Sequence, residues 1–367
     1  MSTADVTSPV RSAERDARLR DLLDLHFHPE HGSRYWLLRE EELGWDVCDR
    51  VRTMDNLRLL GPMPTSDLRA FAVRDFIPRG LHNQLPRFII GETAGTTGRP
   101  CATAYRDDEF QAAFVAPFLQ VARAVGFPQN RSWLWIGPSG PHIIGKAVRE
   151  LARQTGGMDP FSVDFDPRWA KRLADGTLGR QRYLDHVINQ AIDVLIREEI
   201  GVLFTTPPAL AALAARMSDR QREAIRGVHY GGVSMTAAML NEFRAAFPRA
   251  VHLSGYGNTL FGVLMEAADC EREALDYFPL GGRVEFHVLN WYAGSDWPPA
   301  ECERGKTGRV MFHRLDESCL LVGVVERDEA ERIEPSHEAL TLGCQADGLR
   351  NPRPPAKLNA KLQVGIY

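Results

Sequence analysis

The stretch Gly91-Glu-Thr-Ala-Gly-Thr-Thr-Gly-Arg-Pro100 follows directly on the apolar run Arg87-Phe-Ile-Ile90. It holds three glycines and three threonines within ten residues. Glycines let backbone N–H groups approach phosphate oxygens closely, and threonine hydroxyls add further donors. The spacing is not that of a Walker A loop, because no Lys-Ser/Thr pair follows. We therefore expect a short buried strand that ends in a phosphate-binding loop. A flexible Gly/Thr turn between a strand and a helix is the alternative.

Strand-like and helical segments alternate after this loop. We predict strands at 132–136, 161–165, 201–205, 228–230 and 251–254, and helices at 107–125, 145–154, 184–199, 208–215, 219–226 and 236–247. Such alternation predicts βαβ units in largely parallel sheets, covered by helices on both faces. Ligands of these sheets lie beyond the carboxyl ends of the strands, and we expect three Gly-rich turns there.

The flanking regions have a different character. An amphipathic helix is predicted at 14–27, and short β segments at 284–289, 308–313 and 320–326. The fold class is therefore α/β, with two mixed or parallel sheets, flanking helices and a small β-rich subdomain. We expect paired α/β subdomains over residues 1–280, the β-rich subdomain over 281–350, and a tail at 351–367.

Composition restricts the class of partner. The 367 residues are 44% hydrophobic and 25% charged, with a formal net charge of −4. No basic stripe is present, which argues against nucleic acid. No apolar run approaches membrane-spanning length, and the N-terminus lacks the apolar core of a signal peptide, so we expect a cytoplasmic protein that does not contact membranes. The six cysteines form no CxxC pair, and we assign no metal ligands.

The phosphate loop resembles that of the adenylate-forming superfamily, which comprises acyl-CoA ligases, luciferases and peptide-synthetase adenylation domains. The family pattern Thr-Ser-Gly-Thr-Thr-Gly-x-Pro-Lys is matched from Thr93 to Pro100, and Cys101 replaces the lysine. The resemblance implies that ATP, or AMP within an acyl-adenylate, is bound here. Its phosphates are then expected at Thr93, Gly95, Thr96, Thr97 and Gly98.

A second segment, His252-Leu-Ser-Gly-Tyr-Gly-Asn-Thr259, resembles the family's Tyr-Gly-x-Thr-Glu. The resemblance implies that Tyr256 stacks on adenine and that Thr259 acts in catalysis through the α-phosphate. The neighbouring positions then also border the nucleotide: Gly255, Gly257 and Asn258.

The glutamate that binds Mg²⁺ in the family is Leu260 in this chain. A leucine supplies no oxygen ligand to a hard cation. Mg²⁺ is therefore held by another group, of which Glu266 is the nearest downstream, or it binds weakly.

Two more segments fit the resemblance. Tyr230-Gly-Gly-Val-Ser234 matches the turn that passes along the adenine and the acyl group, which assigns Gly231 and Gly232 to the site. Trp135-Ile-Gly-Pro-Ser-Gly-Pro-His-Ile-Ile-Gly145 resembles the segment that gates the acyl pocket. His142 is then a catalytic candidate that positions the carboxylate, and a structural histidine is the alternative.

The ribose site is less regular. The family has Arg-Tyr-x-Thr-Gly-Asp, whose aspartate binds both ribose hydroxyls, whereas this chain has Leu320-Leu-Val-Gly-Val-Val-Glu-Arg-Asp328. Asp328 is the candidate and Glu326 competes with it, because one carboxylate can accept both hydroxyls. A surface acid is the alternative.

The order of motifs across residues 88–290 resembles the phenylacetate–CoA ligase branch. Within it, the Tyr-Gly-Asn-Thr-Leu-Phe-Gly run is similar to the adenylation proteins of phenazine antibiotic pathways, for which griseoluteic acid is the proposed substrate. The resemblance implies an aromatic carboxylic acid substrate. Aromatic side chains near the motifs agree with it: Trp133, Trp135, Tyr230 and Phe261.

Family members carry a mobile C-terminal domain that donates a catalytic lysine. Fewer than twenty residues follow the hinge-like Asp347-Gly348, so we expect that domain to be absent. Adenylation should then be slow unless a partner protein supplies the domain. An acceptor of the acyl group or a downstream biosynthetic protein is a further candidate partner. A homodimer is left open.

Three functions remain in order of preference. The first is an enzyme that forms an acyl-AMP from ATP and an aromatic acid. The second is a degenerate relative that binds AMP or an acyl-adenylate and acts with a partner. The third is an α/β hydrolase or a nucleotide-sugar enzyme, which the missing Gly-x-Ser-x-Gly and Gly-x-Gly-x-x-Gly motifs disfavour.

Overall fold

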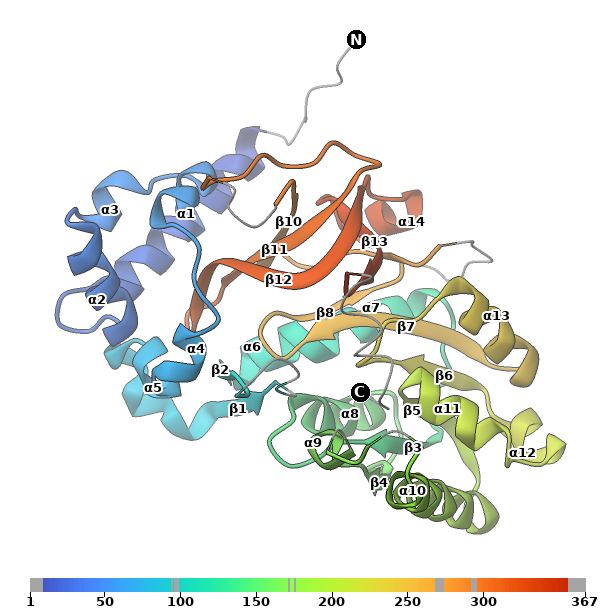
Figure 1. Cartoon of the computed structure of the whole chain (residues 1–367). Helices are drawn as coiled ribbons and strands as arrows, with labels where there is room; N and C mark the ends of the chain where they lie inside the picture. Colours follow the sequence, from blue (N-terminus) through green and yellow to red (C-terminus); the bar gives the residue numbers. More distant parts are fainter. Residues whose placement is uncertain are drawn as a thin grey trace.

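The computed structural model describes residues 9–93, 95, 99–170, 172–174, 176–267, 274–291 and 296–355. Its strands form sheets of six, five and two strands (Figure 1). The N-terminal helices lie beside the five-stranded sheet, and the six-stranded sheet with its own helices occupies the other end of the molecule (Figure 1). This arrangement confirms the predicted α/β class.

The six-stranded sheet has the order β4-β3-β5-β6-β7-β8. Pairs from β4 to β7 are parallel, and β8 runs antiparallel to β7. Its strands are β3 Ser132–Gly137, β4 Phe161–Asp164, β5 Ile200–Thr205, β6 Gly227–Tyr230, β7 Val251–Asn258 and β8 Gly262–Met265. The helices between them are α8 Ile143–Gln154, α9 Pro167–Ala170, α10 Leu178–Arg197, α11 Pro207–Ala214, α12 Asp219–Ala224 and α13 Ala237–Ala246. All six residues of β5 are buried, as expected of a parallel strand covered on both faces.

The five-stranded sheet is antiparallel, with the order β10-β11-β12-β13-β9. Its strands are β9 Asp276–Tyr277, β10 Val284–Leu289, β11 Thr307–Leu315, β12 Leu320–Ile333 and β13 Gly348–Arg353, and α14 His337–Thr341 precedes β13. Strand β9 comes from before residue 280 and β13 crosses residue 350. The division into domains at these residues stays a prediction, because strand pairing alone does not define a folding unit.

The N-terminal part is helical. It comprises α1 Pro9–His26, α2 Arg34–Leu43, α3 Val47–Arg50, η1 Met54–Leu60, α4 Asp67–Ala70, α5 Val73–Phe76 and η2 Arg79–Arg87. The predicted helix at 14–27 corresponds to α1. The indole N–H of Trp36 donates to the carbonyl of Leu320 at 3.0 Å, which fastens α2 to β12. In the described part of the chain, no helix combines the length and the apolarity that a membrane span requires.

The phosphate loop lies within a hairpin rather than between a strand and a helix. Strand β1 (Phe88–Glu92) pairs antiparallel with β2 (Ala102–Arg106) in a sheet of their own. The short run Ala102-Thr-Ala-Tyr-Arg106 has little apolar character, which is why the sequence did not predict a strand there. The loop therefore follows a strand of this separate two-stranded sheet and not a strand of the parallel sheet.

The predicted helix at 107–125 is continuous but irregular. It begins as α6 Asp107–Phe110, widens into a π-helical turn at Gln111–Val115 and ends as α7 Ala116–Ala124. The turn lies against Gly262, where an added Cβ would stand 2.6 Å from the carbonyl oxygen of Ala113. The hairpin of β7 and β8 can therefore pack closely on this helix only with glycine at 262.

A buried cluster of charges joins the three sheets. The guanidinium of Arg314, which is fully buried, donates to the Thr103 hydroxyl at 2.8 Å and to Asp316 at 2.5 Å, and it lies 3.5 Å from the centre of the Tyr105 ring. Arg283 also donates to Asp316, at 3.0 Å. Arg283 donates as well to the carbonyl of Phe261, in the turn between β7 and β8, at 2.6 Å. Because the two arginines share one carboxylate, β2, β11 and this turn are held together in a water-poor interior.

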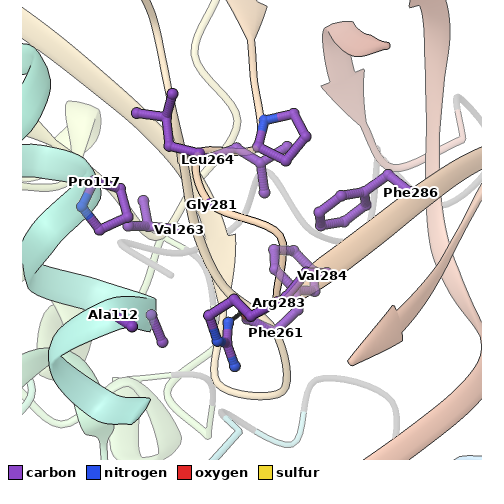
Figure 2. Close-up of a pocket in the computed structure, with 12 residues that line it drawn as sticks. Ala112, Pro117, Phe261, Val263, Leu264, Gly281, Arg283, Val284 and Phe286 are labelled. Atoms are coloured by element: carbon purple, nitrogen blue, oxygen red, sulfur yellow. Dashed lines mark hydrogen bonds between the residues drawn. The ribbon is translucent and has the colours of Figure 1, made fainter. Parts of the chain in front are cut away.

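Two cavities flank this cluster. Figure 2 shows the smaller one, which Phe261, Arg283 and the π-helical residue Ala112 help to line. Its volume of about 10 Å³ is enough for one water molecule and too small for a substrate. The larger, of about 330 Å³, lies among charged side chains of α1 and α6. No residue that was expected to contact the nucleotide lines either cavity, and of the aromatic residues expected near the acyl group only Phe261 lines one of them, the smaller.

Candidate functional site

Strand β7 carries the second predicted motif along its length. The strand was predicted to end at Ser254 in a Gly-Tyr-Gly turn, but it continues to Asn258 because residues 255–258 pair with β8. An added Cβ at Gly257 would lie 2.2 Å from the carbonyl oxygen of Gly262, and one at Gly255 would lie 2.9 Å from Val263. Close strand pairing thus requires both glycines, whatever else they contact.

Two side-chain hydrogen bonds connect β7 with β12. The hydroxyl of Tyr256 donates to Oδ2 of Asp328 at 3.1 Å. The amide of Asn258 donates to Oε1 of Glu326 at 2.7 Å. The structure therefore brings together both carboxylates that the sequence left as competitors for the ribose, and it places them beside the predicted adenine-stacking tyrosine.

One carboxylate oxygen at this place can accept a further hydrogen bond. Oδ1 of Asp328 is buried and accepts no hydrogen bond from the described residues, although Nε of Arg327 lies 3.4 Å away. A buried acceptor without a donor is costly, so it is a natural partner for a ligand hydroxyl. The residues present therefore fit a ribose.

Burial raises the pKa values of two side chains at this place, Glu326 and Tyr256. Burial and the neighbouring charge of Asp328 raise the pKa of Glu326 to about 7. Burial and the same aspartate raise the pKa of Tyr256 well above its ordinary value, so its hydroxyl stays protonated and remains a donor. Near neutral pH the pair of carboxylates can hold a proton, which lowers its negative charge.

Thr259 connects the motif on β7 with the phosphate hairpin, which consists of β1, β2 and the phosphate loop between them. Its hydroxyl donates to the carbonyl of Glu92 at 3.3 Å, and its own carbonyl accepts from Tyr105 at 2.9 Å. An added Cβ at Gly91 would stand 2.9 Å from both Thr259 and Ile143. The end of β1, the turn after β7 and the start of α8 therefore meet at one place.

The phosphate loop itself is only partly described. The Thr93 amide donates to the carbonyl of Cys101 and the Thr93 hydroxyl accepts from the Cys101 amide, both at 2.9 Å. Gly95 has a φ of +67°, a conformation that favours glycine. Thr96, Thr97 and Gly98 lie outside the described residues, so their phosphate contacts stay a prediction.

Cys101, which takes the place of the family lysine, is no substitute for it. The side chain is 4% exposed, and its sulfur donates to the carbonyl of Thr65 at 3.6 Å. The thiol therefore points into the protein and brings no positive charge to the loop.

Arg168 is a neighbour of the loop that the sequence analysis missed. It lies on α9, directly beyond the end of β4, and its Nη2 donates to Oε2 of Glu92 at 2.7 Å and to the carbonyl of Thr93 at 3.2 Å. Lys146 on α8 donates to the carbonyl of Ile90 at 2.7 Å. No motif marks either residue, and only the position of Arg168 just after a predicted strand could have drawn attention to it.

His142 stands at the N-terminus of α8, close to the same place. It is the N-cap residue, 9% exposed, and its amide donates to the carbonyl of Ser139 at 3.1 Å. The preceding carbonyl, of Pro141, accepts from the Glu92 amide at 2.8 Å. The histidine therefore lies near the phosphate hairpin, and its catalytic role stays a prediction.

The Gly-Gly turn follows β6. Gly231 donates its amide to the carbonyl of Thr205 at 3.4 Å, and Gly232 has a φ of +84°. An added Cβ at Gly231 would lie 3.4 Å from the Phe204 ring, whose centre is 4.6 Å from that of Trp135. Aromatic surface thus underlies this turn.

The four aromatic residues expected near the acyl group do not gather in one place. Trp133 and Trp135 are buried in one hydrophobic core, whereas Tyr230 and Phe261 are buried in the other. The ring of Phe261 packs on Phe312 of β11, with centres 5.1 Å apart.

The position of the family's Mg²⁺ ligand does not fit a metal. Leu260 is 3% exposed and packs in the core, and its amide donates to Oδ1 of Asn258 at 2.7 Å. The carboxylate of Glu266 is 8% exposed and accepts from the Ser254 amide at 3.0 Å. Within the described ranges, no three His, Cys, Asp or Glu side chains group closely enough to hold a metal ion.

Solved structures resemble the whole chain. A 2-hydroxyisobutyryl-CoA ligase in complex with 2-HIB-AMP and CoA, in the thioesterification state, matches with a TM-score of 0.66 at 13% identity, over 98% of this chain and 74% of the ligase. The same ligase in the postadenylation state with R3-HIB-AMP gives 0.66 at 12% identity, over 96% and 71%. Its open conformation with 2-HIB-AMP and CoA gives 0.65 at 13% identity, over 95% and 78%.

Sequence comparison adds nothing to this. No protein-family model matches the chain, and no curated protein matches it either. The chain therefore shares the fold of an acyl-CoA ligase over nearly its whole described length, and its chemistry must be argued from its own residues.

Proposed function

We propose that the chain binds ATP and an organic carboxylic acid where β1, β7 and β12 meet, and joins them as an acyl-adenylate. In this reaction a carboxylate oxygen attacks the α-phosphorus, and the bond from that phosphorus to the bridging oxygen of pyrophosphate breaks. The protein's part is to position both reactants and to screen their charge. The observation that carries the proposal is the buried Oδ1 of Asp328 beside Tyr256, which pairs with the charge of Arg327 but accepts no hydrogen bond from the described residues, in a chain that folds like a ligase solved with acyl-AMP.

Each end of the nucleotide has a partner in this proposal. Asp328 accepts hydrogen bonds from the ribose hydroxyls, and Tyr256 packs on adenine. Asn258 holds the carboxylate of Glu326 beside them through its hydrogen bond. Thr259 contacts the α-phosphate. Backbone amides and hydroxyls of the loop from Thr93 to Gly98 hold the pyrophosphate that leaves.

The acid is proposed to be aromatic because the order of motifs resembles that of the phenylacetate–CoA ligase branch, and the buried rings of Phe204 and Trp135 lie beneath the Gly231 turn. His142 would position its carboxylate. A phenazine-type acid in secondary metabolism and a protein acceptor for the acyl group are the finer form of this proposal, which the motif order favours.

A second candidate function is binding without catalysis. The buried Leu260 and the inward-facing Cys101 remove two sources of positive charge at the phosphates, which favours a protein that holds AMP or an acyl-adenylate for a partner. Exchange of labelled pyrophosphate into ATP in the presence of aromatic acids separates the two functions. Exchange supports the enzyme, whereas nucleotide binding without exchange supports the carrier.

The binding claim has its own test. We expect Asp328→Asn to weaken ATP and AMP to a similar extent, about tenfold, because one charged hydrogen-bond acceptor of the ribose is lost. Asp67→Asn is the matched control, since Asp67 also accepts from a tyrosine, Tyr35, at 2.9 Å, in the N-terminal helices. Equal affinities of the Asp328 variant and the wild type in calorimetry would refute the ribose assignment.

A further inference from the structure

The phosphate hairpin lacks two groups that the family pattern places at the phosphates, the lysine and the glutamate that binds Mg²⁺. Glu92 places a carboxylate immediately before the loop, and this acid would repel a polyphosphate. The position of the family lysine holds the buried thiol of Cys101, and the position of the family glutamate holds Leu260. Arg99, the cation of the loop itself, offsets only the charge of Glu92, so a nucleotide bound here calls for a further cation from another part of the chain.

Arg168 is placed to supply it. Its Nη2 donates both to the carboxylate of Glu92 and to the carbonyl of Thr93, the first residue of the loop. The ion pair is half-buried, with 34% of each side chain exposed. The guanidinium therefore stands at the entrance of the loop, and it still has access to solvent and to a ligand.

The guanidinium keeps donors in reserve. Both of its described hydrogen bonds use Nη2, whereas Nε is buried and has no partner among the described residues. Arginine has five N–H donors in a planar fork that suits phosphate oxygens, and it stays charged at any physiological pH. Because no described residue accepts from this buried N–H, its hydrogen-bonding capacity is left to a phosphate oxygen of a ligand in the loop.

The location agrees with this. Asp166 fixes the turn that carries Arg168, because its carboxylate accepts from the amides of Arg168 at 2.8 Å and Trp169 at 3.1 Å. The turn directly follows β4, at the carboxyl end of the parallel sheet, where ligands of such sheets bind.

We infer that Arg168 is a direct ligand of the nucleotide's β- and γ-phosphates, with Glu92 as the positioning residue that aims it. The inference rests on the proposed function, since it presumes that the loop receives a nucleotide. It adds a cation from α9 to the phosphate site, beside Arg99 of the loop itself.

A comparison of ATP with AMP tests the inference. In calorimetry, Arg168→Gln should raise the Kd for ATP by about tenfold or more and the Kd for AMP by less than about twofold, because AMP lacks the two outer phosphates. The Kd of Arg168→Lys for ATP should lie between those of the wild type and of Arg168→Gln, since lysine keeps the charge but loses the planar set of N–H donors. Unchanged AMP affinity also shows that the variant is folded.

The control is Arg149→Gln, which removes an exposed arginine paired with Asp159 at the same 2.7 Å and should leave both affinities unchanged. An Arg168→Gln protein that binds ATP as the wild type does, or that loses ATP and AMP equally, overturns the inference and leaves the proposed function standing. A wild type that binds neither nucleotide overturns both.

Discussion

At the scale of single residues, Glu326 gives the site a dependence on pH. Its pKa is raised to about 7 by burial and by Asp328, so between about pH 4.5 and pH 7 the folded chain binds this proton more tightly than the unfolded chain does. The contribution to stability is complete at low pH and is lost as the pH rises through this window. Glu326→Gln keeps an acceptor for Asn258 and has no such loss.

We predict that Glu326→Gln becomes more stable relative to the wild type as the pH rises from 5 to 8, by on the order of 2 kcal/mol. Urea unfolding of both proteins across this range measures it. The buried histidines His26 and His229 titrate identically in both proteins, so their effect cancels in the difference. A constant difference would mean that Glu326 is charged in the folded protein throughout.

At the scale of elements, the pairing of β7 with β8 sets the position of the site, and glycine permits it. Gly257→Ala should destabilise the fold by about 1–3 kcal/mol, because its Cβ would stand 2.2 Å from a backbone oxygen that cannot move aside easily. Gly179→Ala in α10, where the nearest atom is 3.9 Å away, is the matched substitution and should be neutral or slightly stabilising. Thermal unfolding compares the two, and equal melting temperatures would contradict the pairing.

The helices and strands also show how much of the structure could be predicted from the sequence. Periodicity was sufficient for the parallel strands and most of their helices, because the central strands are buried apolar runs and the long helices have an apolar face. It failed for β2, whose small and polar residues carry no strand signal, and for the second half of β7, where glycines suggested a turn. The pairing of Asp328 with Tyr256 could be expected only from the resemblance. The only sequence signal for Arg168 is its position just after a predicted strand, and that signal does not show which strand end lies beside the loop.

At the scale of the whole molecule, the charge cluster of Arg314, Asp316 and Arg283 joins the three sheets on which the site is built. Arg314→Met should cost about 3–5 kcal/mol of unfolding free energy, because it leaves buried polar groups of β2 and β11 without their cation. Arg149→Met removes a surface pair and should have no measurable effect. Urea unfolding midpoints decide between them, and equal midpoints would show that the cluster does not stabilise the junction.

The proposed nucleotide site places the ribose against β12, and a crystal structure with bound ATP is the measurement that tests this placement. We predict ribose hydroxyls within about 3.2 Å of Oδ1 of Asp328, adenine packed on Tyr256 and the outer phosphates beside Thr93. A nucleotide bound elsewhere, or ribose oxygens that point away from Asp328, would contradict the account.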